Sequence, residues 1–283
     1  MKTGDPHPSV TYEELPLWSA PFGLAILDTI QLKQGMNILD IGSGSGFPML
    51  EIADRAGSAA MVYGIDPSDD AIIMIHQKSE AKESKNATIV KGFAEQLPFD
   101  DNFFDLIVSN NGINNVADQE KVLSECFRTA KPGAQMVAAV NLPGTMIEFY
   151  DVFERALLNN GMHEEIKKMK DHIFEKRKPV EFLTDLLEKA GFSLTGMKTD
   201  SFTYRYVDGT AFFNHFLIRN YFLPTWQSIV PAGSQKLIFD EILATLNKTA
   251  LKKGELVMTI PFVCLDTFKA NPKSKIQNPK SKI

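Results

Sequence analysis

Three glycines occupy alternate positions directly after a short apolar run. The run consists of Ile38, Leu39 and Ile41, and Gly42, Gly44 and Gly46 follow it. Glycine has no Cβ, so it adopts positive φ readily and lets a ligand come close to the backbone. The residues from Phe47 onward have helical spacing, and the whole pattern predicts a buried strand, a tight turn and a helix. Such a turn directs backbone N–H groups and a helix N-terminus towards a bound ligand.

A carboxylate ends the next apolar run. Residues 59–66 predict a second strand that finishes at Asp66. This acid lies about 20–25 residues beyond the glycine turn, where a carboxylate can accept hydrogen bonds from both hydroxyls of a ribose. Asp66 and Pro67 also resemble the start of a helix that the acid would cap. The two roles are compatible.

A cluster of side-chain amides follows the fourth predicted strand, residues 103–110. Asn110, Asn111, Asn114 and Asn115 lie within six residues of one another. Asparagine tolerates left-handed backbone, so the segment is consistent with a simple turn. It is also consistent with a loop of amide donors and acceptors that orients a substrate, although an amide cannot act as a strong base.

The predicted elements that position these residues alternate regularly. Strands and helices alternate five times between residues 37 and 142, which predicts a doubly wound parallel sheet. Ligands of open α/β sheets bind beyond the carboxyl ends of the strands. We therefore expect the glycine turn and the asparagine loop at the ligand-binding edge.

The pattern D-x-G-x-G-x-G from Asp40 to Gly46 resembles motif I of the class I S-adenosylmethionine-dependent methyltransferases. A dinucleotide fingerprint would need Gly or Ala at position 47, where Phe47 stands. Residues 92–99, 103–110 and 131–133 are similar to three further segments of the family, in the expected order. The first departs from the family at Phe93, which replaces the acid that holds the adenine amino group. Phe93 is expected to stack on the adenine instead, with Glu95 or backbone atoms supplying polar contacts.

The resemblance implies a fold and a cofactor. The fold is α/β: a doubly wound, Rossmann-like, seven-stranded and mostly parallel sheet with an antiparallel last strand, plus helical lid insertions. The cofactor is S-adenosylmethionine. The residues expected to contact it are Asp40, Gly42, Ser43, Gly44, Gly46, Asp66, Pro67, Gly92, Phe93, Ala94, Glu95 and Asn110.

The expected reaction is methyl transfer to a small-molecule acceptor. The chain lacks the N-P-P-Y or D-P-P-Y sequence that relatives acting on DNA bases or protein glutamine carry after the fourth strand. A quinone- or sterol-type C-methyltransferase is the alternative within this class. An NAD-dependent oxidoreductase and a non-catalytic S-adenosylmethionine-binding protein are the alternatives outside it.

Candidate catalytic residues are Asn111, Asn114, His215 and His163, and candidate substrate contacts are Trp18, Asn111, Asn114 and Tyr204. Core packing is the favoured interpretation of Trp18.

Composition adds several expectations. The 283 residues are 44% hydrophobic and 23% charged, and the formal net charge of −5 gives no reason to expect nucleic acid as a partner. The two cysteines lack metal-site spacing, so no metal is expected. No apolar run approaches the ~20 residues of a membrane-spanning helix. The N-terminus has no apolar signal core, and a cytoplasmic location is expected. The oligomeric state is left open.

The expected organisation has six parts. They are an N-terminal helical cap (1–34), a cofactor-binding core (35–142), helices and a sixth strand that complete the core (143–208), a helical lid insertion (209–252), the last strand (253–269) and a disordered tail with a repeated sequence (270–283).

Overall fold

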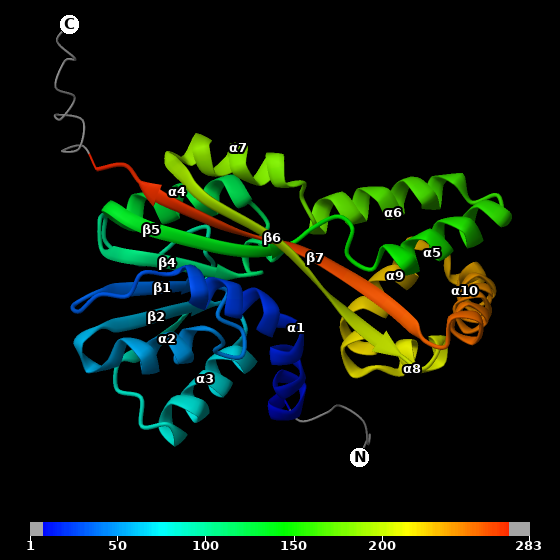
Figure 1. Cartoon of the computed structure of the whole chain (residues 1–283), viewed down its shortest axis with the longest axis horizontal. Coiled ribbons are helices and arrows are strands. Elements are labelled where there is room, and N and C mark those ends of the chain that lie inside the picture. Colours follow the sequence, from blue (N-terminus) through cyan, green and yellow to red (C-terminus); the bar gives the residue numbers. More distant parts are fainter. Residues whose placement is uncertain (1–7, 272–283) are drawn as a thin grey trace, which may run out of the picture. The chain divides into compact units, whose positions relative to one another are not determined.

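The computed structural model describes residues 8–271 and, within its first helix, the side chains from Leu17 onward (Figure 1). Most of the tail expected from the sequence lies outside this range. The described chain divides into two compact units. Unit 1 takes the residues up to Val140, together with Val180–Lys198 and those from Val263 onward. Unit 2 takes Asn141–Pro179 and Thr199–Phe262.

Seven strands form one sheet in the order β3-β2-β1-β4-β5-β7-β6. The pairs β3-β2, β2-β1, β1-β4 and β4-β5 are parallel. The last strand lies between β5 and β6 and runs antiparallel to its neighbours. The prediction of a mostly parallel, seven-stranded sheet with an antiparallel last strand is therefore confirmed. The strands are β1 (Asn37–Ile41), β2 (Met61–Asp66), β3 (Ala87–Lys91), β4 (Phe104–Asn110), β5 (Ala130–Asn141), β6 (Phe192–Tyr206) and β7 (Leu256–Lys269).

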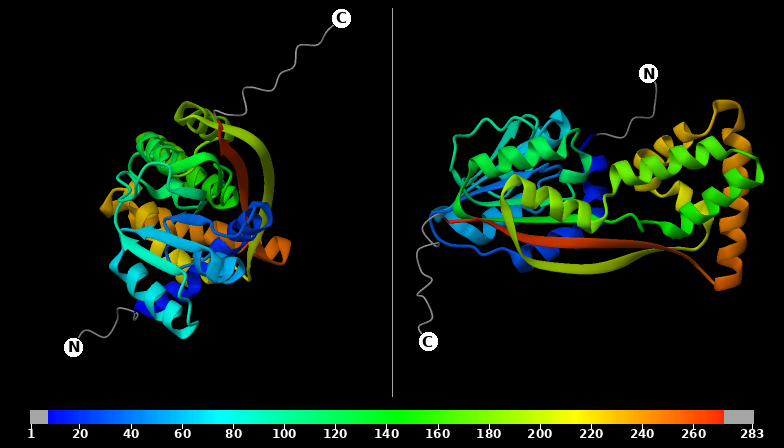
Figure 2. Two further views of the ribbon diagram at one scale, coloured as in Figure 1. Left: turned by 90° about the vertical axis from the view of Figure 1, so that its left-hand side faces the viewer. Right: turned by 90° about the horizontal axis from the view of Figure 1, so that it is seen from above.

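The helices of unit 1 connect and cover these strands. Helix α1 packs against α3 and β4, whereas α4 and α7 pack against each other (Figure 2). The strand β5 starts at Ala130, and its pairing with β4 shifts register between Phe104 and Leu106. The helices are α1 (Pro8–Thr29), α2 (Met49–Ala56), α3 (Asp69–Ala81), α4 (Gln119–Thr129) and α7 (Val180–Ala190), with 3-10 turns at Gly57–Ala59 and Ile113–Asn115.

The core of unit 1 is centred on β1. Ile38, Leu39 and Ile41 are fully buried, as expected of a parallel strand covered on both faces. Because β1 lies in the middle of the strand order, it brings the turn that follows it to the centre of the carboxyl edge.

Unit 2 is built around a cluster of aromatic side chains. Phe149 of α5 stacks on Trp226 of α9 with ring centroids 4.0 Å apart, and Phe212 of α8 contacts both. All three are fully buried, so they form the core of this unit. The helices are α5 (Ile147–Asn159), α6 (His163–Lys176), α8 (Gly209–Asn214), α9 (Leu223–Ile229) and α10 (Ala232–Lys253), with a π-helix at Ile218–Phe222.

This packing differs from the expected organisation of the chain. We expected residues 143–208 to complete the cofactor-binding core and residues 209–252 to form a separate lid. In the structure α5 and α6 belong to unit 2 together with the helices that follow residue 209. The aromatic contact just described joins α5 to α8 and α9, and Glu148 of α5 also accepts a hydrogen bond from the Thr259 N–H of β7.

The contact between α1 and the glycine turn yields a prediction. A Cβ on Gly23 of α1 would lie 2.2 Å from the Phe47 ring. We expect Gly23→Ala to lower the free energy of unfolding by about 1–2 kcal/mol in urea titrations, because overpacking outweighs the helix propensity gained. Gly233→Ala is the matched control, since Gly233 also lies in a helix and a Cβ added to it would have no atom within 4 Å. Equal stability of the two variants would show that the Phe47 contact imposes no constraint.

Candidate cofactor site

The three glycines of the turn after β1 all have positive φ, at 71°, 50° and 90° for Gly42, Gly44 and Gly46. A Cβ on Gly42 would lie 3.0 Å from the Cα of Gly112, in the loop after β4. A Cβ on Gly46 would crowd Leu50 and Ile75. At Gly44 the nearest atom would be the Gly42 carbonyl oxygen at 4.0 Å, so a side chain there would enter open space. Two of the glycines therefore serve packing, and the third leaves room above the backbone.

The Asp66 carboxylate lies beside this turn, at the end of β2. Its Oδ2 accepts a hydrogen bond from the Gly44 N–H at 2.9 Å, and its Oδ1 accepts one from the Ser68 N–H at 2.9 Å. The side chain that caps α3 is Ser68, whose Oγ accepts from the Ala71 N–H. Asp66 thus holds the glycine turn in place.

The Asp40 carboxylate is the most unusual group of the site. It is fully buried in β1, and neither oxygen has a hydrogen-bond partner of normal geometry among the described residues. Burial, and next the negative charge of Asp66, raise the pKa of Asp40 to about 8, against a smaller opposing effect of the Met49 N–H. A carboxyl group that is buried without hydrogen-bond partners favours a cationic ligand group nearby, because the cation would stabilise the ionised form of the carboxyl group.

The segment expected to hold the adenine shows one exposed aromatic ring. Phe93 follows β3 and is 68% exposed. Glu95 is already engaged, because its Oε1 accepts from the backbone N–H groups of Ala117 and Asp118 ahead of α4. The Gly92 N–H donates to the Asp66 carbonyl oxygen, which keeps this segment next to the acid. Ala94 is buried.

The side chains of the asparagine loop are engaged in hydrogen bonds within the protein. Asn110 donates from Nδ2 to the carbonyl oxygens of Ser19 and Phe47, so it links α1 to the glycine turn. Asn111 has a φ of 58° and accepts from the Asn114 Nδ2 at 3.1 Å. The loop is therefore a left-handed turn, and its amides are held in fixed positions by hydrogen bonds.

The other candidates lie in several places. Trp18 is buried in unit 1 and contacts Phe22 edge to face. In unit 2 the Tyr204 and His215 rings lie 5.8 Å apart, and Tyr206 contacts both of them. His163 is the first residue of α6 and lies outside that cluster. Sequence reasoning missed Tyr206, although its spacing of two from Tyr204 on a strand places both rings on one face.

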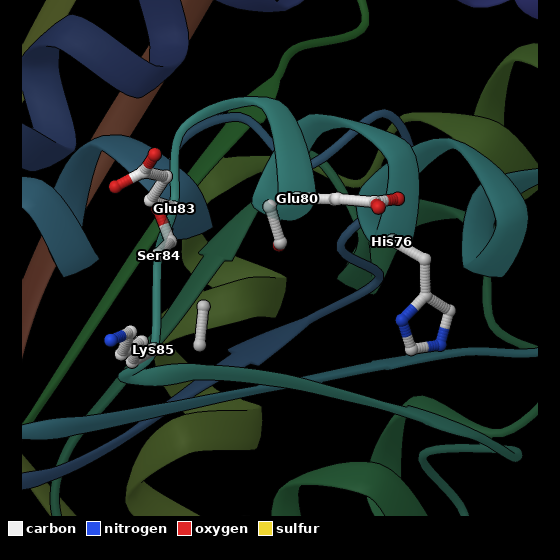
Figure 3. A pocket seen from close by; sticks show the side chains of 7 residues that line it. His76, Glu80, Glu83, Ser84 and Lys85 are labelled. Carbon is white, nitrogen blue, oxygen red and sulfur yellow. The ribbon is translucent and has the colours of Figure 1, made fainter.

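A surface depression on unit 1 has no part in this site. It lies beside α3 and the start of β3, and His76, Glu80, Glu83, Ser84 and Lys85 line it (Figure 3). It borders the amino end of β3 at Ala87, whereas the glycine turn follows a carboxyl end.

Within the described residues, no group of three or more His, Cys, Asp or Glu side chains is arranged to hold a metal ion. No helix there has the length and apolarity to cross a membrane.

Comparison with known proteins agrees with this geometry. A family model described as a methyltransferase domain matches residues 32–190. A demethylmenaquinone methyltransferase from Bacillus mycoides is 34% identical over 120 residues, which cover 42% of this chain and 51% of that protein. The chain thus spans about half the length of this relative.

Two solved structures share the fold. The YcgJ protein from Bacillus subtilis superposes with a TM-score of 0.59 at 16% identity, covering 89% of this chain and 99% of the other. A phosphoethanolamine N-methyltransferase from Haemonchus contortus, in complex with S-adenosylhomocysteine, superposes with a TM-score of 0.54 at 18% identity. The match covers 88% of this chain and 52% of the other.

The chain belongs to this methyltransferase-domain family, since the family match takes in more than half of its residues. Its class is that of the S-adenosylmethionine-dependent methyltransferases, and S-adenosylmethionine rather than NAD is the cofactor. The residues present fit that molecule. The open space at Gly44 leaves room for it, and the partnerless Asp40 carboxylate suits its ammonium and sulfonium charges.

The open space at Gly44 gives a prediction about binding. We expect Gly44→Ala to weaken S-adenosylhomocysteine binding at least about tenfold by calorimetry, because the new methyl group takes the room above the turn. Gly35→Ala is the matched control. Gly35 also has positive φ and would have no atom near an added Cβ, but it precedes β1. Both variants carry a similar backbone strain of about 1–2 kcal/mol. Equal loss of affinity in both would contradict the proposed role of Gly44.

The raised pKa of Asp40 gives a prediction about stability. The folded value of about 8 exceeds the ordinary pKa of 3.8, so the folded protein binds more protons than the unfolded chain between these limits. The stability contributed by this group is therefore present at low pH and is lost as pH rises towards 8.

We expect Asp40→Asn to remove this loss and to weaken cofactor binding. The melting temperature of the ligand-free variant, relative to the unmodified protein, should rise by several degrees from pH 5 to pH 8. A difference that stays constant across this range would show that Asp40 is ionised in the folded protein.

Proposed function

We propose that this protein transfers a methyl group from S-adenosylmethionine to a ring carbon of a small, apolar acceptor of the hydroquinone type. The proposal rests first on the name of the Bacillus mycoides relative, which is a demethylmenaquinone methyltransferase. Because that match covers only about half of the relative, the acceptor needs support from this chain's own residues.

The chemistry of the asparagine loop carries the proposal. Residues 109–116 comprise the last two residues of β4 and the loop after it at the carboxyl edge, and they contain four amides but no histidine, lysine or acid. When bound, the cofactor supplies an already activated methyl group, so the protein mainly has to align the acceptor and exclude water. Fixed amides such as Asn111 and Asn114 can hold ring oxygens by hydrogen bonds, but they cannot remove a proton from a poorly acidic acceptor.

This limitation favours an acceptor that is nucleophilic without a strong base. A hydroquinone ring carbon meets this condition, because the ring oxygens increase its electron density. The ring carbon would take the methyl group as the methyl–sulfur bond breaks, and the ring would then lose the proton of that carbon to water, which needs no strong base because the loss restores aromaticity. An aliphatic alcohol would need a general base at the same place, and the loop provides none. Sterol alkenes share the apolar character but offer fewer oxygens for the amides to bind.

The test is an acceptor assay with identification of the product. Purified protein, labelled S-adenosylmethionine and a reduced naphthoquinone should yield a ring-methylated product, identified by mass spectrometry and NMR. A catechol, a primary amine and a sterol serve as competing acceptor classes, and Gly44→Ala serves as the cofactor-deficient control. Methylation of oxygen or nitrogen alone, or of the sterol alone, would contradict the proposal. Cofactor binding without turnover of any acceptor would favour a non-catalytic binding protein.

The amide pair itself can be tested in that assay. We expect Asn114→Ala to raise the KM for the hydroquinone and to lower kcat/KM about tenfold or more, because one hydrogen bond to a ring oxygen is lost. The affinity for S-adenosylhomocysteine should stay unchanged. An equal loss of cofactor affinity would place Asn114 at the cofactor rather than at the acceptor.

A further inference from the structure

Unit 2 buries an arginine that has no acid beside it. Arg177 follows α6 as its C-terminal capping residue and is only 3% exposed. No carboxylate of the described chain forms an ion pair with it. Its guanidinium lies over the Tyr150 ring, 5.4 Å from the ring centroid, but burying a charge without a counterion is costly and calls for an explanation.

The hydrogen bonds around Arg177 converge on one phenol oxygen. The Arg177 Nη1 donates to the Tyr150 Oη at 3.0 Å, and the Trp226 Nε1 donates to the same oxygen at 2.9 Å. Both lone pairs of this oxygen are thereby used, and the Tyr150 hydroxyl hydrogen remains as a further donor. Tyr150 is 2% exposed and Trp226 fully buried.

The edge of the guanidinium away from Tyr150 is still available. Its Nε is buried without a hydrogen-bond partner in the described part of the chain, and no bond is formed there by Nη2. These two nitrogens carry the parallel N–H groups that bind a carboxylate in bidentate fashion. The negative end of α6 favours a cation at this place, but it supplies no hydrogen bond to the Arg177 side chain.

The polar groups that Arg177 and Tyr150 leave available are donors, and the side chains packed on the neighbouring Trp226 are aromatic. Phe149 stacks on Trp226 with centroids 4.0 Å apart, and the Phe222 ring lies 5.5 Å from Trp226. We infer that Arg177 and Tyr150 form a binding site in unit 2 for the carboxylate of a small aromatic acid. This site goes beyond the proposed methyl transfer and does not rest on it, because all the residues that define it belong to unit 2.

The test uses benzoate as the probe, with benzamide as a neutral molecule of the same shape and inorganic phosphate as a tetrahedral anion. In thermal-shift and calorimetric titrations of the full chain, benzoate should raise the melting temperature by several degrees at saturation. Benzamide and phosphate should not. Arg177→Met should fold and lose the response to benzoate. Arg177→Lys keeps the charge but lacks the two parallel N–H groups of the guanidinium, so it should bind benzoate at least tenfold more weakly. Arg155→Met on the exposed side of α5 is the matched control and should respond like the unmodified protein.

Equal effects of benzoate and benzamide, or an undiminished response of Arg177→Met, would overturn the inference and leave Arg177 a structural residue. A response to phosphate alone would overturn the assignment to a carboxylate. If Arg177→Met does not fold, Tyr150→Phe decides the question, because it keeps the charge and removes one donor. This variant should weaken benzoate binding several-fold, and an unchanged affinity would contradict the site.

Discussion

A carboxylate that is buried without a hydrogen-bond partner is the physical constraint on which the site in unit 1 depends. Asp40 lies in the central strand and borders the glycine turn, and the nearby Asp66 charge opposes its ionisation. Such an arrangement reduces the stability of the ligand-free protein at neutral pH. A cationic ligand removes the penalty, so binding and ionisation are coupled. The family to which the chain belongs uses a cofactor that carries an ammonium and a sulfonium group.

The backbone around this acid leaves little freedom for change. Gly42 and Gly112 lie so close that either loop would have to move if a Cβ were added. Asn110 joins the glycine turn to α1 through two carbonyl oxygens, and Asp66 holds the Gly44 N–H. The loops after β1, β2 and β4 are therefore connected to one another directly. This connection gives unit 1 a preformed edge at which a ligand meets fixed donors and acceptors.

Much of unit 1 could be predicted from the sequence, because its signals are local. Apolar runs such as residues 38–41, each followed by a helical pattern, were sufficient for the parallel sheet, and the D-x-G-x-G-x-G spacing was sufficient for the turn. The contact of Glu95 with backbone groups more than twenty residues away has no local signal. The same is true of the contact between Gly23 and Phe47, since neither residue reveals its partner.

The division into units was harder to predict for a related reason. A helix with an aromatic face, such as α5, must bury that face, but its periodicity does not say against which neighbour. In the structure the partners of Phe149 lie more than sixty residues later, in α8 and α9. The buried Arg177 was equally hidden, because a single arginine after a charged helix is typical of an exposed residue.

The most direct test of the cofactor site is a calorimetric titration of the full chain with S-adenosylhomocysteine at pH 7, repeated in two buffers of different ionisation enthalpy, with NAD as the control. We predict micromolar binding of S-adenosylhomocysteine, no binding of NAD, and release of a proton that disappears in Asp40→Asn. Binding without proton release would contradict the role given to Asp40. Binding of NAD in place of S-adenosylhomocysteine would contradict the cofactor site itself.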